Sequence, residues 1–522
     1  MIASPSALAS ATSRTVEPNS VTPASPTADA PLAAIDMGSN SFRLEIAQLQ
    51  GGQYRRREYL KETVRLGAGL DAEGNLTEPA MQRGLDCLQR FADHLQGFAP
   101  TRVRAAATQT LREARNRDEF LSRAQQALGY PIEVISGREE ARLIYAGVAR
   151  LQASSLPRLV IDIGGRSTEM ILGQGRTPQT AESFQVGSVS LSLRFFPEGR
   201  YTEAAFRAAQ IAAGAEFEEA LSLFERSRWR HALGSSGTVG AVSQILAASG
   251  VTDGRITPPA LRWCIEQCLA AGHMDALRLP GLKDDRRAVV AGGLCILYTL
   301  LTQFDIEELQ PAKGALRQGV IFDLAERLGV SSGAGAPRLD MREASVLALQ
   351  QRFGVDIAQA QRVQKLAVEL HRQLVGRAPR EIQRELEWSA ALHEIGMMVS
   401  HHDHHRHSAY LLAHVDAPGF SQSQLRRLGN LVLGQRGGLR KLDPLLGDET
   451  LLWQIVAMRL AVVVCHARAD IVTRGLRLAR GRSGIEIHVP RTWLREQPRA
   501  VYLLREEAQA WTRAGRLAMT LV

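Results

Sequence analysis

Two segments of this chain repeat one strand–turn–strand pattern, and this repeat constrains the fold more than any other feature. The first is AAIDMGSNSFRLEIAQL at residues 33–49, and the second is LVIDIGGRSTEMILG at residues 159–173. In each, an acidic residue ends an apolar run and small residues follow it, as in a hairpin with a tight turn. Such a repeat predicts a duplicated α/β domain. The segments align at four positions: Asp36 with Asp162, Gly38 with Gly164, Ser41 with Ser167, and Leu44 with Met170.

Strand-like and helix-like patterns alternate around this repeat as far as residue 330. The small, flexible stretch SSGAGAP at 331–337 is typical of a linker, and beyond it helix follows helix. The first thirty residues are rich in Ala, Ser, Thr and Pro and lack the basic start and apolar run of a signal peptide. We therefore expect a disordered tail (1–30), two α/β domains (31–145 and 146–330), a helical domain (338–480) and a small mixed element (481–522).

The composition is that of an ordinary globular protein, with 45% hydrophobic and 22% charged residues. A net charge of +9 is a modest basic bias that fits an acidic partner. No run of 18 apolar residues occurs, so no transmembrane segment is expected. The five cysteines are scattered, which favours reduced, buried thiols in a cytoplasmic protein.

Three glycine-containing loops can cradle phosphate. Two are the turns of the repeated hairpins, and the third, in HALGSSGTVGAVSQIL, leads from a strand into a helix. Converging backbone N–H groups and a helix N-terminus both favour anions. One such loop alone is weak evidence, but three together indicate a phosphate site. The candidate phosphate contacts are Asp36, Gly38, Ser39, Asn40, Ser41, Gly164, Gly165, Arg166, Ser167, Thr168, Gly234, Ser235, Ser236, Gly237 and Thr238.

These motifs, taken in order, resemble the exopolyphosphatase/guanosine-pentaphosphatase (Ppx/GppA) family. The resemblance also includes ATQTLREARN, IEVISGREEARLIYAGV, GALRQGVIFDL and ALHEIGMMVSHHDHHRHSAYLLAHVDAPGF, and it runs from about Pro31 to near the C-terminus. It implies an α/β fold of two actin-like (ribonuclease H-like) domains, followed by an all-α HD-like domain and a small C-terminal α/β element. The appended helical domain looks closest to the exopolyphosphatase branch.

The resemblance also implies roles for three acids. Glu140, the second acid of SGREEAR, matches the family's catalytic carboxylate, which orients or deprotonates the attacking water. Asp162 and Glu169 match positions associated with Mg²⁺, an ion that needs few carboxylates when phosphate and water supply its other ligands. We expect Glu139 to lie on the surface. Arg112 is either structural or anion-binding.

Three departures from the family pattern bear on activity. Arg166 stands where the family has a third glycine, and its side chain could block phosphate or become an additional cationic ligand. In the closing segment PAKGALRQG, Lys313 stands where the family commonly has an acid before Gly314. Gln318 stands where the family commonly has a Glu after Arg317.

A dense histidine cluster follows at residues 393–407. Taken alone it suggests a metal site. The resemblance is to an HD-type domain, but no full ligand set is evident beside the pair His393–Glu394. We therefore favour a degenerate HD-like domain used for substrate binding or dimerisation.

Our leading hypothesis is a Mg²⁺-dependent exopolyphosphatase that removes terminal phosphate from inorganic polyphosphate. A guanosine pentaphosphate 5'-phosphohydrolase is one alternative, and a non-catalytic polyphosphate or nucleotide sensor is another. We expect a cytoplasmic homodimer with no nucleic-acid partner, and peripheral association with a membrane is the alternative location. Basic residues such as Arg55–Arg57 and Arg436–Lys441 are candidates for a polyanion path.

Overall fold

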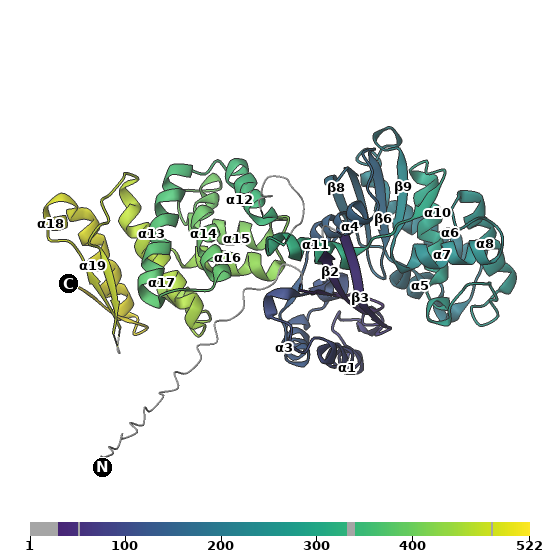
Figure 1. Ribbon diagram of the computed structural model, residues 1–522, viewed down its shortest axis with the longest axis horizontal. Coiled ribbons are helices and arrows are strands. Elements are labelled where there is room, and N and C mark those ends of the chain that lie inside the picture. Colours follow the sequence, from purple (N-terminus) through teal and green to yellow (C-terminus); the bar gives the residue numbers. More distant parts are fainter. Residues whose placement is uncertain (1–29, 51–52, 331–339, 482–483) are drawn as a thin grey trace, which may run out of the picture.

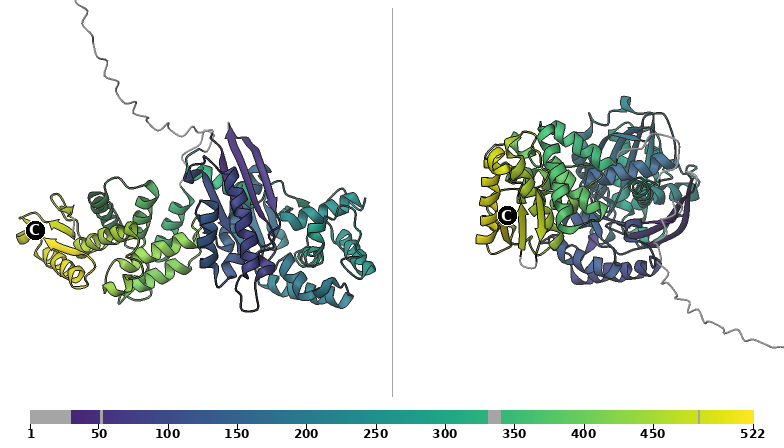
Figure 2. Two further views of the ribbon diagram at one scale, coloured as in Figure 1. Left: turned by 90° about the horizontal axis from the view of Figure 1, so that it is seen from below. Right: turned by 60° about the vertical axis from the view of Figure 1, so that its left-hand side comes forward.

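The computed structural model describes residues 30–50, 53–330, 340–481 and 484–522 (Figure 1). The predicted linker at 331–337 lies outside these residues, as does the predicted tail except for Ala30. The described chain forms two sheet-containing domains, with a helical region on one side of them and the outer helices of the second domain on the other (Figures 1 and 2).

Two five-stranded sheets have the same topology. In each, a three-strand antiparallel meander is extended by two parallel strands, in the orders β3-β2-β1-β4-β5 and β8-β7-β6-β9-β10. The duplication predicted from the two hairpins therefore extends to whole sheets. The strands are β1 (Leu32–Met37), β2 (Phe42–Gln50), β3 (Gln53–Glu62), β4 (Val103–Ala107), β5 (Ile132–Val134), β6 (Arg158–Ile163), β7 (Thr168–Gln174), β8 (Thr177–Phe184), β9 (His231–Ser235) and β10 (Leu309–Pro311).

Two helices, α4 (Gly137–Leu151) and α11 (Leu316–Arg327), pack together between the sheets and share a buried cluster with both. Their backbones approach closely because glycines face the neighbouring helix. A Cβ on Gly319 would lie 1.8 Å from the Leu143 carbonyl oxygen. The predicted domain border at 145/146 is therefore wrong in detail: it cuts α4, which belongs to both domains.

The remaining helices of the sheet domains cover the outer faces. Amphipathic helices bury one side against a sheet and expose the other. The first domain has α1 (Glu78–His94), α2 (Gln109–Glu113) and α3 (Arg117–Leu128). The second has α5 (Ser188–Phe195), α6 (Glu203–Phe217), α7 (Ser236–Ala248), α8 (Pro258–Ala271), α9 (Asp284–Arg287) and α10 (Val290–Gln303).

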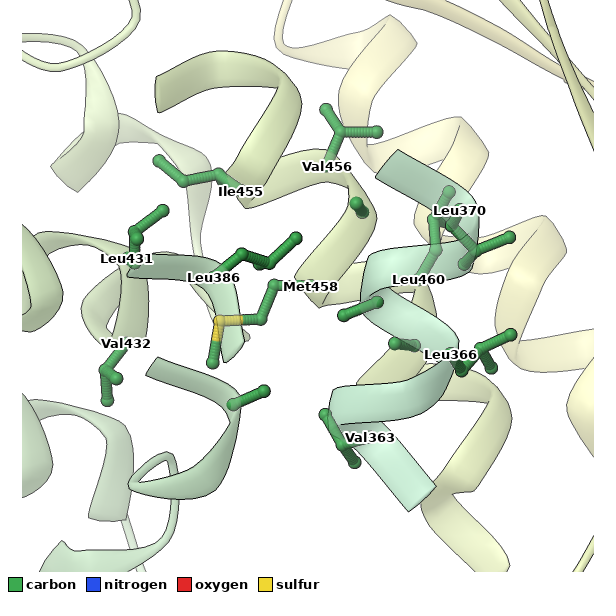
Figure 3. Packing of buried hydrophobic residues seen from close by; sticks show 14 of the residues in the cluster. Val363, Leu366, Leu370, Leu386, Leu431, Val432, Ile455, Val456, Met458 and Leu460 are labelled. Atoms are coloured by element: carbon green, nitrogen blue, oxygen red, sulfur yellow. The ribbon is translucent and has the colours of Figure 1, made fainter. Parts of the chain in front are cut away.

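The helical domain surrounds an aliphatic core, part of which Figure 3 shows. Its helices are α12 (Met341–Arg352), α13 (Ile357–Val375), α14 (Arg380–Ala391), α15 (His404–His414), α16 (Gln422–Gly434) and α17 (Glu449–Val464). The C-terminal sheet of β11 (Arg477–Arg480), β12 (Gly484–His488) and β13 (Ala518–Leu521), with α18 (Trp493–Glu496) and α19 (Pro498–Arg513), shares this core. The predicted border at 480/481 is wrong in detail, because it separates β11 from its partner β12.

Within the described residues, one segment, Glu449–Ala467, is long and apolar enough to cross a membrane. It consists mainly of α17, which is the central core helix of the helical domain, and 67% of its apolar window is buried. Burial in a protein core explains its hydrophobicity. All five cysteines are free and buried, as expected of reduced thiols.

Candidate active site

A cleft of about 440 Å³ opens where the two hairpin turns face each other. The start of α7, the first turn of α4 and the segment leading into α11 complete its walls. The carboxyl ends of β1, β6 and β9 meet here, which is where open α/β sheets place their ligand sites. The sequence-predicted residues that line the cleft are Asp36, Gly38, Ser39, Asn40, Ser41, Glu140, Asp162, Gly164, Gly165, Ser167, Ser236, Gly237 and Thr238.

The acid of the first hairpin is held by arginine. Asp36 stands opposite Arg43 in the β1–β2 register, and Arg43 Nη1 donates to Asp36 Oδ2 at 3.0 Å. Arg317 Nη1 lies 3.6 Å from the same oxygen. The carboxylate is therefore neutralised, and the two guanidinium groups present positive charge at the cleft wall.

The acid of the second hairpin has no such partner. Asp162 stands opposite Glu169 in the β6–β7 register, so two carboxylates are adjacent and buried. Burial raises the pKa of Asp162 to about 6, although Ser235 and Arg43 oppose the rise. Burial, with Glu140 and Asp162 nearby, raises the pKa of Glu169 well above its usual value. These buried acids therefore favour a proton or a bound cation at this corner of the cleft.

Glu140 lies in the first turn of α4, where the Ser136 hydroxyl caps the helix. Arg112 Nη1 donates to Glu140 Oε2 at 2.8 Å and also to the Ile135 carbonyl at 3.0 Å. Burial raises the pKa of Glu140 to about 7, against the opposing effect of Arg112. A carboxylate with a pKa near neutrality can accept a proton during turnover. Arg112 therefore holds this carboxylate in place.

Glu139 is buried, contrary to the expectation from the sequence. We expected it on the surface, but it is 2% exposed and pairs with Arg142 at 2.7 and 2.8 Å. Sequence reasoning treated it as an ordinary first-turn acid, because its partners lie on β4, α11 and a distant loop.

The third loop presents the N-terminus of α7 to the cleft, through Ser236, Gly237 and Thr238. The Ser236 and Thr238 hydroxyls donate to the Ile163 carbonyl at 2.7 and 3.0 Å, which ties the loop to the end of β6. Gly237 leaves room for Arg286, whose Nη2 lies 2.0 Å from where a Cβ would be. The helix N-terminus and this arginine both favour an anion.

The structure places several predicted contacts outside the cleft lining. Arg166 points toward the first domain, where it contacts Glu113 Oε2 at 2.8 Å and the Gly67 carbonyl at 3.2 Å. Its side chain is therefore not part of the cleft lining, and its φ is not positive. Thr168, Gly234, Ser235 and Glu169 lie behind the lining: the Thr168 hydroxyl bonds to Val186, and the Ser235 hydroxyl to Gly314.

Sequence reasoning missed most of the cleft's cations. Arg43 could have been found, because the hairpin register places it opposite Asp36. The others come from β3, from the end of the α8–α9 connection and α9, and from the segment before α11 and its first turn, which no local motif connects. Of the predicted polyanion path, Arg56 lines the cleft. The lining cations are Arg43, Arg56, Lys61, Lys283, Arg286, Lys313 and Arg317.

The departure at Gln318 has a local explanation. Its amide nitrogen donates to both carboxylate oxygens of buried Glu45 at 2.8 Å, and Arg317 Nε donates to Glu45 at 3.1 Å. Gln318 thus supports the wall that carries Arg317. Lys313, the other departure, adds a positive charge at the cleft.

The residues of the second hairpin fit a divalent cation. Glu169 Oε2 is buried without a hydrogen-bond partner, while Oε1 accepts from the Ser183 hydroxyl at 2.8 Å. Within the described ranges, no group of three His, Cys, Asp or Glu side chains forms a complete metal cage. Mg²⁺ needs no such cage, because it usually keeps waters and substrate phosphate oxygens as ligands.

The histidine cluster of the helical domain is engaged in other contacts. His393 Nδ1 contacts the Ala390 carbonyl at 2.7 Å, and Glu394 pairs with Arg468. His404 Nε2 lies 3.0 Å from Arg436 Nη1. Within the described residues, these histidines do not join other His, Cys, Asp or Glu side chains in a group of three, and the degenerate HD-like domain stays a prediction.

Comparison with known proteins gives a consistent assignment. The sequence matches the Ppx/GppA phosphatase family over residues 46–328, and domain III of these phosphatases over 341–508. It is 36% identical, over 492 residues, to a guanosine-5'-triphosphate,3'-diphosphate pyrophosphatase of Aeromonas hydrophila subsp. hydrophila, covering 92% of this chain and 97% of the relative.

Solved structures resemble the two sheet domains. An exopolyphosphatase-like protein is 25% identical with a TM-score of 0.53, over 58% of this chain and 99% of that one. An exopolyphosphatase from Cytophaga hutchinsonii is 26% identical with a TM-score of 0.50, over 58% of this chain and 100% of that one. The duplicated α/β fold, the three glycine loops and the buried acids thus occur together in a chain that belongs to the Ppx/GppA phosphatase family, whose members hydrolyse phosphoanhydride bonds.

Proposed function

We propose that this protein removes the 5'-terminal phosphate from guanosine pentaphosphate (guanosine 5'-triphosphate 3'-diphosphate). The sequence analysis ranked polyphosphate first because of the appended helical domain. The Aeromonas hydrophila pyrophosphatase shares that domain over nearly its whole length, so the domain does not distinguish the two substrates. The observation that carries the proposal is the cleft itself, where buried acids face phosphate-binding loops and a set of cations.

In this proposal Glu140 acts as general base. It accepts a proton from water as the water oxygen attacks the terminal phosphorus. The bond from that phosphorus to its bridging oxygen then breaks, and the nucleotide leaves with one phosphate fewer. A pKa of about 7 leaves a large fraction of Glu140 ionised at neutral pH, ready to take the proton. Arg112 fixes the direction of the carboxylate.

Asp162 and Glu169 would hold Mg²⁺ together with substrate oxygens. The ion supplies charge neutralisation for the phosphoryl group. The remaining negative charge of the phosphates is balanced by this chain's own groups. These are the N-terminus of α7, the two hairpin turns, and Arg43 and Arg317. These groups bind and orient the phosphates, and closing them around the substrate keeps other water away.

The test is phosphate release from guanosine pentaphosphate and from long-chain polyphosphate, with Mg²⁺, by the wild type and Glu140→Gln. We expect a higher kcat/KM on the nucleotide and a kcat lowered about 100-fold or more by the substitution. Glu203→Gln, an exposed first-turn acid of α6 away from the cleft lining, is the matched control. A preference for polyphosphate would reject the proposed substrate. Full activity of Glu140→Gln would reject the base.

Polyphosphate remains the second candidate, because the Cytophaga hutchinsonii structure of similar fold is an exopolyphosphatase. Family membership favours an enzyme over the sensor. The predicted homodimer and cytoplasmic location stay predictions.

A further inference from the structure

The residue before the proposed base is the centre of a buried charge network. Glu139, Arg142, Asp323, Arg104 and Arg327 form what we call the Glu139 network. Arg142 Nη2 donates to Asp323 Oδ1 at 2.6 Å, while Arg104 and Arg327 each donate to Asp323 Oδ2 at 2.7 Å. Although burial opposes its charge, these three arginines hold the pKa of Asp323 below its usual value. The network joins α4, α11 and β4 into one rigid unit.

The helical domain forms hydrogen bonds to this network through Gly419. Its N–H donates to Glu139 Oε2 at 2.8 Å, and its carbonyl accepts from Arg327 Nη2 at 2.7 Å. Both polar groups of one peptide segment are thus held by charges of the sheet domains. Charge-assisted bonds of this kind are about twice as strong as neutral ones.

The segment that carries Gly419 is itself fixed in the helical domain. The Ser345 hydroxyl donates to the Pro418 carbonyl at 2.6 Å, and Phe420 packs edge-on against Trp388 at 5.0 Å between ring centroids. Gly419 has φ of +88°, and a Cβ there would lie 2.9 Å from Arg342 Cγ. Its backbone can therefore present both groups only as glycine.

The first turn of α4 meets three parts of the molecule. Arg138 pairs with Glu182 of the second domain at 2.9 Å and approaches Asp416 of the helical domain at 3.6 Å. Glu139 binds Gly419, and Glu140 faces the cleft. Adjacent residues of one helical turn move together, so a shift at Glu139 shifts Glu140 as well.

We propose that Glu139 is a positioning residue, through which the docked helical domain fixes the catalytic Glu140. The proposal rests on Glu140 acting as the base in the proposed function. Misplacement of a catalytic group by about 1 Å lowers turnover on the order of 100-fold. The helical domain therefore contributes to the chemical step without contacting the substrate.

The test compares Glu139→Gln, Glu139→Asp and Gly419→Ala, with Glu203→Gln, an exposed first-turn acid of α6, as the control. We expect Glu139→Gln and Gly419→Ala to lower kcat on the order of 10- to 100-fold while KM stays within about twofold. Glu139→Asp keeps the charge and should recover part of the loss. Glu139→Gln and Gly419→Ala both disrupt the same contact. The kcat of the double variant should therefore be little lower than that of either single variant.

Each variant is assayed well below its unfolding temperature on guanosine pentaphosphate and on polyphosphate. A wild type that hydrolyses polyphosphate but not guanosine pentaphosphate contradicts the proposed substrate. In that case the kcat values of the variants on polyphosphate still test the role of Glu139. If neither substrate is hydrolysed, hydrogen exchange of residues 137–142 in Gly419→Ala decides: faster exchange there supports the coupling, and unchanged exchange overturns it. A folded Glu139→Gln enzyme with wild-type kcat, or one changed only in KM, also overturns the proposal.

Discussion

The two hairpins that line the cleft share a sequence pattern and a strand register, yet their charges differ. In the β1–β2 hairpin the residue opposite the acid is Arg43, and in the β6–β7 hairpin it is Glu169. One substitution at an equivalent position converts a neutral acid–arginine pair into a pair of buried acids. The first hairpin can therefore face an anion, and the second favours a cation or a proton.

This divergence explains why a phosphatase gains from a duplicated domain. The transferred phosphoryl group needs positive charge around its oxygens, and a metal ion needs acids to hold it. A single hairpin cannot supply both, because its acid is either neutralised or left free. Two copies that face each other across one cleft supply both, and the following predictions test that division.

The largest expected effect comes from removing the acid pair. Glu169→Gln should lower phosphate release about 100-fold or more and raise the Mg²⁺ concentration needed for half-maximal rate, because one ligand is lost. The fold should not suffer: Glu169 Oε2 has no hydrogen-bond partner, and burial disfavours its charge. The checks are initial rates against Mg²⁺ and the unfolding temperature of the metal-free protein at pH 8.

The matched control is Glu45→Gln on the first hairpin. Glu45 is fully buried like Glu169, but it is held by Arg317 and Gln318. Its substitution leaves a buried guanidinium with less compensation and should lower the unfolding temperature. Equal stability losses for the two variants would contradict the contrast between the hairpins.

The second prediction concerns stability against pH. Burial raises the pKa of Asp162 to about 6 and that of Glu140 to about 7. The folded protein therefore keeps protons that the unfolded chain has released, and the metal-free protein loses stability as pH rises from about 4 to 7. Each pKa unit corresponds to about 1.4 kcal/mol in the free energy of unfolding. Asp323, with its lowered pKa, opposes this loss only below about pH 5, where the unfolded chain still binds a proton, and adds no slope above it.

Denaturant unfolding in the presence of a chelator, followed across this pH range, measures the effect. Mg²⁺ should restore stability most at the upper end, where the acids would otherwise carry uncompensated charge. Asp162→Asn should flatten the slope. A metal-free protein whose stability rises between pH 4 and 7 would show that cations already compensate the second hairpin.

Sequence reasoning reached the hairpins and cradles because their chemistry is local. The acid, the glycines and the serines of each turn are neighbours in the chain, and the strand period places them at one sheet edge. Glu140 was found only through resemblance, since a first-turn acid is otherwise unremarkable. Buried Glu139 was misplaced, because Arg104 and Gly419 approach it from other parts of the chain. Arg166 was assigned to phosphate because its partner, Glu113, lies in the other domain.

The third prediction weakens the anion-binding hairpin. Arg43→Gln removes a guanidinium that lines the cleft and pairs with Asp36. We expect KM for the nucleotide to rise about 10-fold with a smaller change in kcat, since the charge contributes to binding in ground and transition states alike. Arg57→Gln on β3, whose side chain bonds to Gln48 away from the cleft lining, is the control. A 100-fold fall in kcat would instead place Arg43 at the phosphoryl group being transferred.

The smallest expected effect is at Arg166, the residue that makes the second turn unlike a triple-glycine cradle. Arg166→Gly removes a half-buried ion pair to Glu113 and adds backbone freedom, each at about 0.5–1 kcal/mol of stability. Activity should stay within about threefold, because the side chain does not line the cleft. Glu113→Gln breaks the same pair without introducing glycine, so the difference between the variants isolates the backbone effect. A tenfold or greater loss of activity in Arg166→Gly, with Glu113→Gln unaffected, would mean that Arg166 leaves Glu113 and contacts the substrate during turnover. The second hairpin would then bind anions as well as a cation, which would contradict the proposed difference between the two hairpins.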